Sequence, residues 1–569
     1  MASLLRRLIV LGLAGILVLG LPFAASPGAS ETGQVEDFET GDFSHLPWRT
    51  SPAAPWSVQS DVRQSGSYAA RAGHIEDSGW SWLQVQVEVT AASAIGFWYR
   101  VSSEPDFDFL RFLVDGVEVG KWSGETGWQP FFYLVTPGKH TFRWEYAKDN
   151  SDSAGEDTAW VDSIVFPVMR IPSVAVPACT ITVQPHQSIQ EALYRAPNGA
   201  VICLSEGTWK TGHIVVGGDI VLRGAGPDKT ILELGPEPHF PNEEGLWAVG
   251  SGNVTVEGCK LNRIEVKDSA KITIINSTVN YVLARNTSSV NAIGSQLGSV
   301  NLISVWLSEK STGNFTDCSV SVGELWVEEN AALTMTSCEI YSDSRGIEVF
   351  GRAKLRATGC RIAAWYCVSG GSDTVVTLES TIITGEHGVG AGDRSKMTLT
   401  DCTIAGCGYG GVRVGGSAQV ILEGCRIVGN GWMGFDGGVI IGTVFSSQGT
   451  SPRVSLNNCI IEHNYNGLLV GLIAGTVEVR NTTIRKNGVH PKTGAIDSFS
   501  GYGILLGHAS STELTVVDST IVNNAGWGIR AYIAKCGYSP GPEGDFTGKV
   551  VLKGTNVIEG NGQGQVCIP

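Results

Sequence analysis

Gly258-Cys259-Lys260-Leu261 opens a phrase that recurs down the last two-thirds of the chain, as Asp317-Cys318-Ser319-Val320, Ser337-Cys338-Glu339-Ile340 and Gly359-Cys360-Arg361-Ile362. Each copy has a small residue, a cysteine, a variable residue and an aliphatic residue. Between positions 259 and 425 the phrase returns every 18 to 23 residues, with serine replacing cysteine in some copies. This period is too short for a two-helix repeat and fits one turn of a β-solenoid. The sequence therefore predicts a stack of parallel coils, about a dozen in number.

The cysteines of this phrase are expected to lie above one another inside the coils. No Cys-x-x-Cys pair or neighbouring histidine supplies a tetrahedral zinc set. Stacking separates successive Cβ atoms by about 4.8 Å, beyond the roughly 3.8 Å of a disulfide, and no activating cation recurs beside the thiols. We therefore expect a ladder of small buried side chains. Cysteines outside this row are candidates for disulfides that clamp the two ends: Cys179 with Cys203, and Cys536 with Cys567.

A second phrase, Ile-x-x-Asn followed by a glycine and a new strand, marks a turn in the later coils. An asparagine that recurs once per coil can join its neighbours in a continuous ladder of amide hydrogen bonds. We expect the glycine that follows to permit the backbone angles of a bend. The asparagines are Asn430, Asn464, Asn487, Asn524 and Asn561, and the glycines include Gly411, Gly467, Gly503 and Gly528.

Composition favours a turn-rich all-β protein. Glycine accounts for 73 of 569 residues, whereas charged residues make up only 17%. The net charge of −15 and the isoelectric point near 5.2 argue against a nucleic-acid partner, which would require a basic stripe. Neutral glycans, or acidic glycans bridged by cations, remain open as partners.

The first residues are typical of an export signal. Arg6 and Arg7 precede an apolar run from Leu8 to Leu19, and small residues follow. We predict a signal peptide over residues 1–30, with an uncleaved membrane anchor as the alternative. No later stretch reaches transmembrane length, so we expect a protein that is secreted or held at the cell surface.

Residue usage predicts two domains. All 13 cysteines lie at or after Cys179, whereas nine of the 16 tryptophans lie between Trp48 and Trp160. Short alternating strands separated by Gly/Ser/Asp turns predict a β-sandwich over residues 31–168. A proline-containing linker is expected at 169–177, and the parallel coils at 178–569.

The first domain resembles the MAM-like jelly-roll modules of secreted bacterial proteins, through Phe38-Glu39-Thr40-Gly41, Ser65-Gly66-Ser67-Tyr68-Ala69 and Trp160-Val161-Asp162-Ser163-Ile164. Such modules often hold a calcium ion between the first and last strands. The resemblance implies Glu39 and Asp162 as its ligands, and carboxylate oxygens suit that ion. Ordinary surface carboxylates at strand ends are the alternative.

The second domain resembles the pectin-lyase-like right-handed parallel β-helices. The resemblance rests on the order of its first elements: the strand Ile181-Thr182-Val183, an amphipathic helix capped by Ser188, then Gly207-Thr208-Trp209 and Arg223-Gly224-Ala225-Gly226. A helix at this point would cover the exposed end of the solenoid. The fold expected for the whole chain is therefore all-β, a sandwich followed by a right-handed parallel β-helix.

Period-two alternation predicts one candidate binding face on the β-helix. In the strand after each glycine turn, Leu325 and Val327 should point inward, and the alternating residues outward. Aromatic rings beside carboxylates and arginines on a flat face suit sugar rings, although an ordinary solvated face is the alternative. The candidate binding residues are Trp326, Glu328, Glu348, Phe350, Arg413 and Arg530.

Three long insertions should project from one side of the C-terminal half, and long loops on a rigid scaffold often carry recognition. They contain Trp432, Phe435, Asp436, His490, Lys492, Asp497 and Tyr538. They are equally suited to covering apolar outward residues such as Leu469 and Leu505.

Catalytic signatures of the β-helix enzymes are absent from the sequence. There is no Asp-Asp pair and no Gly-His-Gly, so hydrolysis of the polygalacturonase type loses support. Asp393-Arg394, with Arg413 one coil later, is the nearest approach to a lyase set, and Glu386-His387 is a second isolated pair. Solvated turn residues are the simpler interpretation of both pairs.

The sequence therefore favours binding of an extracellular polysaccharide. A carbohydrate-active enzyme, of the uronate lyase type, and a structural or adhesive surface protein are the alternatives, because unrelated functions share this fold.

Overall fold

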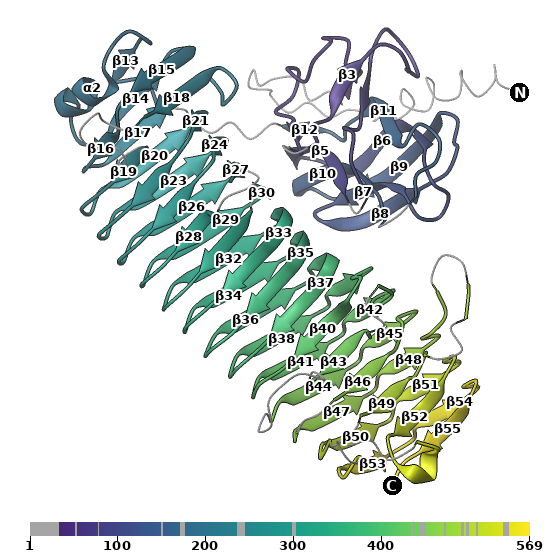
Figure 1. The fold of residues 1–569 in the computed structure, drawn as a ribbon. Helices are drawn as coiled ribbons and strands as arrows, with labels where there is room; N and C mark the ends of the chain where they lie inside the picture. Colours follow the sequence, from purple (N-terminus) through teal and green to yellow (C-terminus); the bar gives the residue numbers. More distant parts are fainter. Residues whose placement is uncertain are drawn as a thin grey trace, which may run out of the picture.

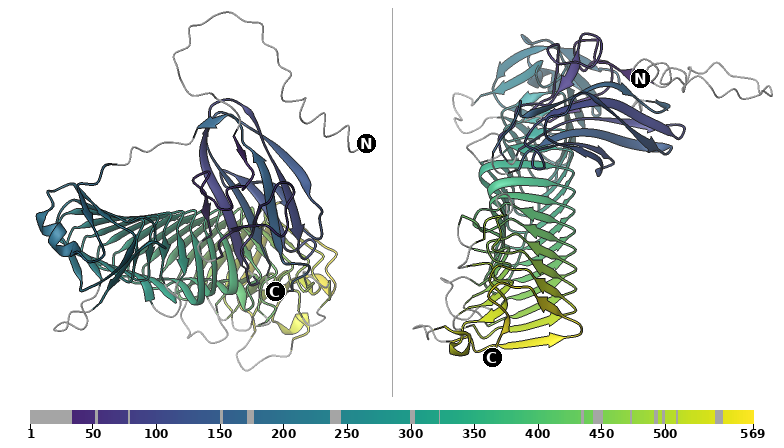
Figure 2. Two further views of the ribbon diagram at one scale, coloured as in Figure 1. Left: turned by 90° about the horizontal axis from the view of Figure 1, so that it is seen from above. Right: turned by 90° about the vertical axis from the view of Figure 1, so that its right-hand side faces the viewer.

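The computed structural model describes residues 34–569, except for 52–53, 78, 150–151, 171–176, 236–244, 299–302, 322, 434–435, 443–450, 472–473, 491–493, 497–499, 508–509 and 539–544. The predicted signal peptide and most of the predicted linker lie outside the described residues. Two all-β units follow one another in the chain, and the first lies along one side of the second (Figures 1 and 2).

The first unit is an antiparallel β-sandwich, as expected. One sheet contains β1 (Val35–Glu36), β3 (Ser57–Gln59), β4 (Ala69–Arg71), β6 (Ser93–Ser102), β9 (Gln129–Val135) and β11 (Thr158–Val165). The other contains β2 (Arg49–Thr50), β5 (Trp80–Val89), β7 (Phe109–Val114), β8 (Val117–Trp122), β10 (Gly138–Ala147) and β12 (Met169–Arg170). Phe97, Phe112 and Trp144 pack between the sheets with ring centroids 4.8–5.3 Å apart. Strand β12 pairs with β5, so the sandwich extends two residues into the predicted linker.

The second unit is the predicted parallel β-helix. Its first sheet has 16 strands among the described residues, one per coil: β13 (Ile181–Val183), β14 (Ala200–Leu204), β17 (Ile220–Arg223), β20 (Asn253–Glu257), β23 (Lys271–Ile275), β26 (Ser289–Ile293), β29 (Thr312–Thr316), β32 (Ala332–Thr336), β34 (Lys354–Thr358), β36 (Val375–Glu379), β38 (Lys396–Thr400), β41 (Gln419–Glu423), β44 (Arg453–Asn457), β47 (Thr476–Arg480), β50 (Glu513–Val517) and β53 (Lys549–Lys553). There are more coils than the dozen counted from the repeated phrase, because that phrase begins only at Cys259.

The second sheet of the β-helix runs from β15 (Gly207–Thr211) to β55 (Gly564–Cys567). In the middle coils single long strands replace the usual pair of short ones. They are β33 (Glu339–Val349), β35 (Arg361–Gly370) and β37 (Ile382–Ala391). Their neighbours are β30 (Ser319–Ser321) and β31 (Glu324–Val327) on one side, and β39 (Thr403–Ala405), β40 (Gly410–Val414) and β42 (Arg426–Val428) on the other.

The small residue that precedes each cysteine makes the bend between the two sheets. It adopts the left-handed conformation, with φ between +45° and +64°, at Gly258, Asn276, Gly294, Asp317, Ser337, Gly359, Ser380, Asp401, Gly424, Asn458, Asn481 and Asp518. Glycine, asparagine and aspartate tolerate this region best, which explains the first position of the repeated phrase. The residue that follows is buried at all twelve positions: a free cysteine at seven of them and a serine or threonine at the other five, as the ladder of small side chains predicted.

The predicted asparagine ladder is confirmed in the later coils. Each buried amide donates to the next Oδ1: Asn430 to Asn464 at 2.9 Å, Asn464 to Asn487 at 3.1 Å, Asn487 to Asn524 at 2.8 Å and Asn524 to Asn561 at 2.9 Å. Each amide also bonds the backbone of its neighbouring coils. The ladder therefore holds this turn in register from one coil to the next.

The role predicted for the glycines after these asparagines is wrong. Gly467 is not among the residues with positive φ, and a Cβ there would lie 2.5 Å from the carbonyl oxygen of Gly503 and 3.0 Å from Nδ2 of Asn487. Close approach between coils and to the ladder requires a glycine at this position, rather than a special backbone angle.

Both ends of the β-helix are closed as predicted. Helix α2 (Ile189–Arg195) is capped by Ser188, whose side chain accepts a hydrogen bond from the Glu191 amide, and its Ile189 is buried in the core. Disulfides join Cys179 to Cys203 and Cys536 to Cys567. The helix therefore covers the core at the N-terminal end, and the disulfides fasten the elements at both ends.

A buried cluster of charges joins the sandwich to the β-helix. On β10, Glu145 pairs with Arg143 of the same strand at 3.0 Å and with Arg361 of β35 at 2.9 Å, while Arg143 also pairs with Glu339 of β33. Arg49 adds a bond to the carbonyl of Asp317 at 3.1 Å. The cluster alternates in sign across the boundary, so each buried charge has an opposite partner.

Two tryptophans of β5 cover the arginines of this cluster. The Arg143 guanidinium lies 4.7 Å from the Trp82 ring, and that of Arg361 lies 4.9 Å from the Trp80 ring. Stacking on an aromatic face suits a guanidinium that has lost its water. The outer face of the sandwich sheet that contains β5 and β10 therefore packs against the β-helix.

The asparagine ladder gives a first prediction. Replacing Asn487 by alanine removes partners from the Asn464 and Asn524 amides and from the Ile461 carbonyl, which lie in the core. Each buried group left without a partner costs about 1–3 kcal/mol. Urea unfolding of N487A should show a correspondingly lower free energy of unfolding. N330A, at an exposed turn, is the control, and equal losses in both variants would contradict the role of the ladder.

Domain docking should weaken at low pH. Burial alone would raise the pKa of Glu145, but the Arg361, Arg143 and Arg111 charges outweigh it and hold the pKa below its ordinary 4.5. The docking energy from this carboxylate is therefore fully present above pH 4.5 and is lost as pH falls through the lowered pKa. Small-angle scattering should show the domains separating in that range.

The E145Q variant is the matched test of the docking prediction. The substitution removes the negative charge that Arg143 and Arg361 share, which should lower the free energy of docking by about 3–5 kcal/mol. Scattering from the variant should therefore already show separated domains at neutral pH. A profile identical to that of the wild type would show that Glu145 does not hold the domains together.

Candidate functional site

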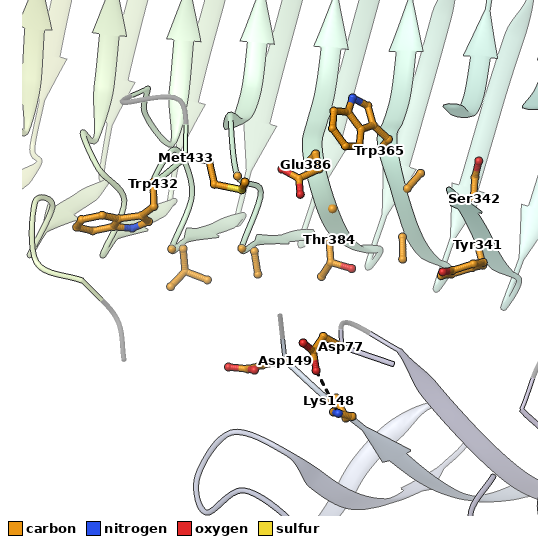
Figure 3. A pocket seen from close by; sticks show the side chains of 18 of the residues that line it. Asp77, Lys148, Asp149, Tyr341, Ser342, Trp365, Thr384, Glu386, Trp432 and Met433 are labelled. Carbon is orange, nitrogen blue, oxygen red and sulfur yellow. Dashed lines mark ion pairs between the residues drawn. The ribbon is translucent and has the colours of Figure 1, made fainter. Parts of the chain in front are cut away.

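A cleft of about 600 Å³ lies where the sandwich meets the middle coils. The β-helix supplies one wall through β33, β35, β37 and the coils that follow, and the sandwich supplies the other through Asp77, Phe107, Lys148 and Asp149. In Figure 3 the labelled residues of the two units lie on opposite sides of this space. The cleft exists because docking places loops of the sandwich above the strands without covering them.

One register row of the second sheet forms the floor of the cleft. Tyr341 pairs with Ala363, Ala363 with Thr384, Thr384 with Ala405, and Ala405 with Val428. Except for Tyr341 at one end, these side chains are small, so the floor stays low over several coils. Parallel stacking makes such a row continuous, and a groove along it runs parallel to the axis of the β-helix.

Aromatic rings border the floor. Tyr341 is 46% exposed and Trp365 is 48% exposed. At the other end Trp432 donates from Nε1 to the His463 carbonyl at 2.9 Å, and the His490 ring packs 4.8 Å from it. These contacts fix the Trp432 ring in the cleft wall, whereas Tyr341 and Trp365 offer open ring surface to a ligand.

The lining is acidic. Glu386 stands in β37, and its Oε2 atom is buried and has no hydrogen-bond partner among the described residues. A Cβ added at Gly408 would lie 2.4 Å from that oxygen, so the glycine makes room for the carboxylate. The carboxylates that line the cleft are Asp77, Asp149, Asp343 and Glu386.

A lysine on the sandwich wall is already paired. Lys148 Nζ lies 3.1 Å from Asp77 and 2.8 Å from Asp157. Burial alone would lower its pKa, but hydrogen bonds to the two aspartates raise it, so the ammonium stays charged. Behind it, burial raises the pKa of Asp108 to about 6. The Lys148 charge is therefore paired with carboxylates of the sandwich, and the cleft lining remains acidic.

The binding face predicted from alternation lies on a different row. Trp326, Glu348 and Arg413 fall on one register line, which continues to Arg530, and Leu325 and Val327 point inward as expected. None of the six predicted binding residues lines the cleft. Their role in binding stays a prediction.

Each charged residue of that row already has a partner within the protein. Glu348 is only 4% exposed and accepts from Arg345 at 3.1 Å, and burial raises its pKa. Arg413 pairs with Asp436, and the Arg530 guanidinium stacks 3.9 Å from the Tyr538 ring. Glu348 lies on the predicted outward row, but it is buried there beside the Arg345 side chain.

The aromatic members of the row form an edge-to-face series. The Trp326 ring lies 5.9 Å from Trp306 and 6.2 Å from Phe350. Trp306 Nε1 donates a hydrogen bond to Oε1 of Glu328 at 2.8 Å, so the second carboxylate predicted for the binding face also has a partner within the protein. These residues stabilise one another along the outside of the coils.

The two isolated pairs of the sequence have different surroundings. Asp393 and Arg394 occupy an exposed turn, where Arg394 pairs with Asp373 at 2.7 Å, as the solvated interpretation predicted. Glu386 and His387 are in β37 instead, with the His387 ring stacked between Tyr366 at 4.1 Å and Tyr409 at 4.8 Å. The turn interpretation of this second pair is wrong.

Glu39 and Asp162 both bind one loop of the sandwich. Asp162 Oδ2 accepts from the amides of Gln64 at 2.9 Å and Ser65 at 3.1 Å, and Glu39 Oε1 accepts from those of Ser67 at 2.7 Å and Tyr68 at 3.0 Å. Amide donors thus occupy an oxygen of each carboxylate, an arrangement that favours a loop anchor over an ion site. Calcium at this pair stays a prediction.

Sequence reasoning missed Tyr341 and Trp365 but did single out Trp432 and His490 as loop residues. The adjacent Trp365 and Tyr366 were the available signal, because two neighbouring rings in a strand cannot both point inward. Phe435, Lys492 and Asp497, predicted with the same loops, lie outside the described residues. Among the described residues, no helix is long and apolar enough to cross a membrane.

Similar proteins of known structure share low identity with this chain. The catalytic unit of a thermostable GH87 alpha-1,3-glucanase from Streptomyces thermodiastaticus strain HF3-3 is 13% identical over 93% of this chain and 98% of that chain, with a TM-score of 0.37. The CBM22-1 xylan-binding domain of Paenibacillus barcinonensis Xyn10C is 11% identical over 26% of this chain and 100% of that chain, with a TM-score of 0.19. At these scores neither likeness assigns a function.

A search of curated proteins found no significant match. The family model of the right-handed beta helix region matches residues 345–521, which include β35, β37 and the cleft floor from Ala363 onward. The parallel sheets continue the same winding on both sides of the matched segment. The second domain of this chain is a right-handed parallel β-helix.

Proposed function

We propose that this protein binds a neutral polysaccharide in the cleft between its two domains. The observation that supports the proposal most directly is the open ring surface of Tyr341 and Trp365 beside a low floor. Exposed aromatic rings in a concave site stack on the apolar faces of sugar rings, and carboxylates accept hydrogen bonds from sugar hydroxyls. The row of small residues gives a chain of sugars room to lie along the coils.

Charge supports a neutral ligand over an acidic one. Among the described residues the cleft has four lining carboxylates and one lysine, which is paired with Asp77 and Asp157, and the whole chain carries a net charge of −15. This field repels polyanions such as uronate chains. The lyase alternative therefore has less support than binding of a neutral glycan.

We also propose that the protein acts outside the cytoplasm. Disulfides close both ends of the β-helix, and such bonds persist in oxidising compartments. An exported location agrees with the signal peptide predicted over residues 1–30 and with a polymeric ligand that does not enter cells.

The cleft and the face predicted from alternation can be separated by two tryptophan variants. W365A should weaken binding to an insoluble neutral glucan or xylan about tenfold or more, as loss of a central aromatic anchor does. W326A, outside the cleft, should bind like the wild type. Pull-down isotherms measure both. Loss of binding in W326A alone would move the site to the outer row.

Hydrolysis of the bound chain is a second candidate function, favoured by the buried Oε2 of Glu386, which has no hydrogen-bond partner in the described part of the chain. A general acid is a carboxyl group that is held in the cleft and can donate its proton to the bound sugar chain. Glycoside hydrolysis also needs a second carboxylate, and Asp77, Asp149 and Asp343 line the same cleft. Without such chemistry the cleft would serve adhesion or capture only.

The E386Q variant tests the hydrolytic candidate. If the wild type releases reducing ends from a glucan or xylan that it binds, E386Q should retain binding and lose release by about 100-fold or more. D393N, in an exposed turn outside the cleft, is the matched control. A wild-type protein that binds without releasing any ends would remove hydrolysis and leave binding intact.

A further inference from the structure

Three carboxylates gather at the end of the sandwich that borders the cleft. One oxygen each from Glu104, Asp108 and Asp149 lies within 4.8 Å of the others. Glu104 and Asp108 belong to the turn between β6 and β7, where the Asp108 amide donates to the Glu104 carbonyl at 3.2 Å. Asp149 follows β10 and is one of the residues that line the cleft. Two separate segments thus supply the cluster.

The buried member of this cluster lacks a full set of partners. Asp108 has no exposed surface, and its Oδ1 accepts from the Asp149 amide at 3.0 Å. Its Oδ2 is buried without a hydrogen-bond partner among the described residues. Buried carboxylate oxygens are nearly always bonded, so an exception points to a bound ion or water.

The lysine next to the cluster in the chain directs its charge mainly to other carboxylates. Lys148, the neighbour of Asp149 in the chain, directs its ammonium to Asp77 and Asp157. Carboxylates this close repel one another strongly unless a positive charge lies between them. A cation from solvent would satisfy the charge and the free Asp108 oxygen at once.

We propose that Glu104, Asp108 and Asp149 bind a calcium ion at the sandwich wall of the cleft. Calcium takes six to eight oxygen ligands at 2.3–2.6 Å in flexible geometry, so three carboxylate oxygens that lie within 4.8 Å of one another can share one ion. Magnesium requires near-ideal octahedral geometry and keeps several of its waters, so it suits a cluster of three protein carboxylates less well. The ion ties the β6–β7 turn to the segment after β10 and so holds one wall of the cleft in place.

The site is distinct from the calcium pair implied by resemblance, Glu39 and Asp162. There, two amides occupy an oxygen of each carboxylate. Here, a buried oxygen remains unpaired. Variants of the two locations therefore form a matched set for one experiment.

The full chain, stripped with EDTA and desalted, should take up one Ca²⁺ in a calorimetric titration with CaCl₂, with a melting temperature that rises with added CaCl₂. D149N and E104Q should lose at least about tenfold in Ca²⁺ affinity, and E39Q and D162N should keep the wild-type affinity. MgCl₂ should compete weakly. Circular dichroism of each variant checks that it is folded.

Three outcomes would overturn the proposal. The first is a wild-type chain that takes up no Ca²⁺ at millimolar concentration. The second is Ca²⁺ affinity unchanged in both D149N and E104Q, and the third is loss of uptake in E39Q or D162N while D149N binds normally. The last result would place the ion at the first and last strands of the sandwich. Polysaccharide binding by the cleft is measured separately, in EDTA and in CaCl₂, so failure of one proposal does not decide the other.

Discussion

The structure depends on one backbone constraint, a left-handed bend repeated at the same point of successive coils from Gly258 to Asp518. Because Gly, Asn, Asp or Ser occupies that point, the chain turns without strain and returns to the same register. The cysteine or serine that follows then lies in the core, and the next strand pairs with its counterpart one coil away. Every lateral row of the β-helix, including the cleft floor, follows from this regular return.

The sandwich converts a flat β-helix surface into a cleft. Its Glu145 is surrounded by arginines from both units, and tryptophans of β5 cover two of them. A buried ion cluster of this kind contributes more to orientation than to net stability, because its partners must meet in one geometry to offset the loss of water. That orientation places Asp77 and Asp149 on the side of the cleft opposite the coils that carry Glu386, Tyr341 and Trp365 (Figure 3).

Several features were predictable from local residue patterns. The spacing of the cysteine phrase predicted the parallel coils, and Ile-x-x-Asn predicted the amide ladder, since both repeat with the period of the fold. Ser188 predicted the cap of α2. Alternation also placed Trp326 and Arg413 on one row. It could not show that Arg345 covers Glu348 or that Asp436 pairs with Arg413, because alternation gives the side of a strand on which a residue lies and not the path of a long side chain or of a loop.

What the sequence by itself determined is therefore the repeating part of this protein: its fold class, its coil period, its buried ladders and its closed ends. Only the tertiary structure decided where a ligand has room. The cleft lies between residues such as Asp77 and Glu386, which are far apart in the chain, and it exists only in the docked arrangement. A repeat records contacts between neighbouring coils, whereas the docking of two surfaces leaves no period in the sequence.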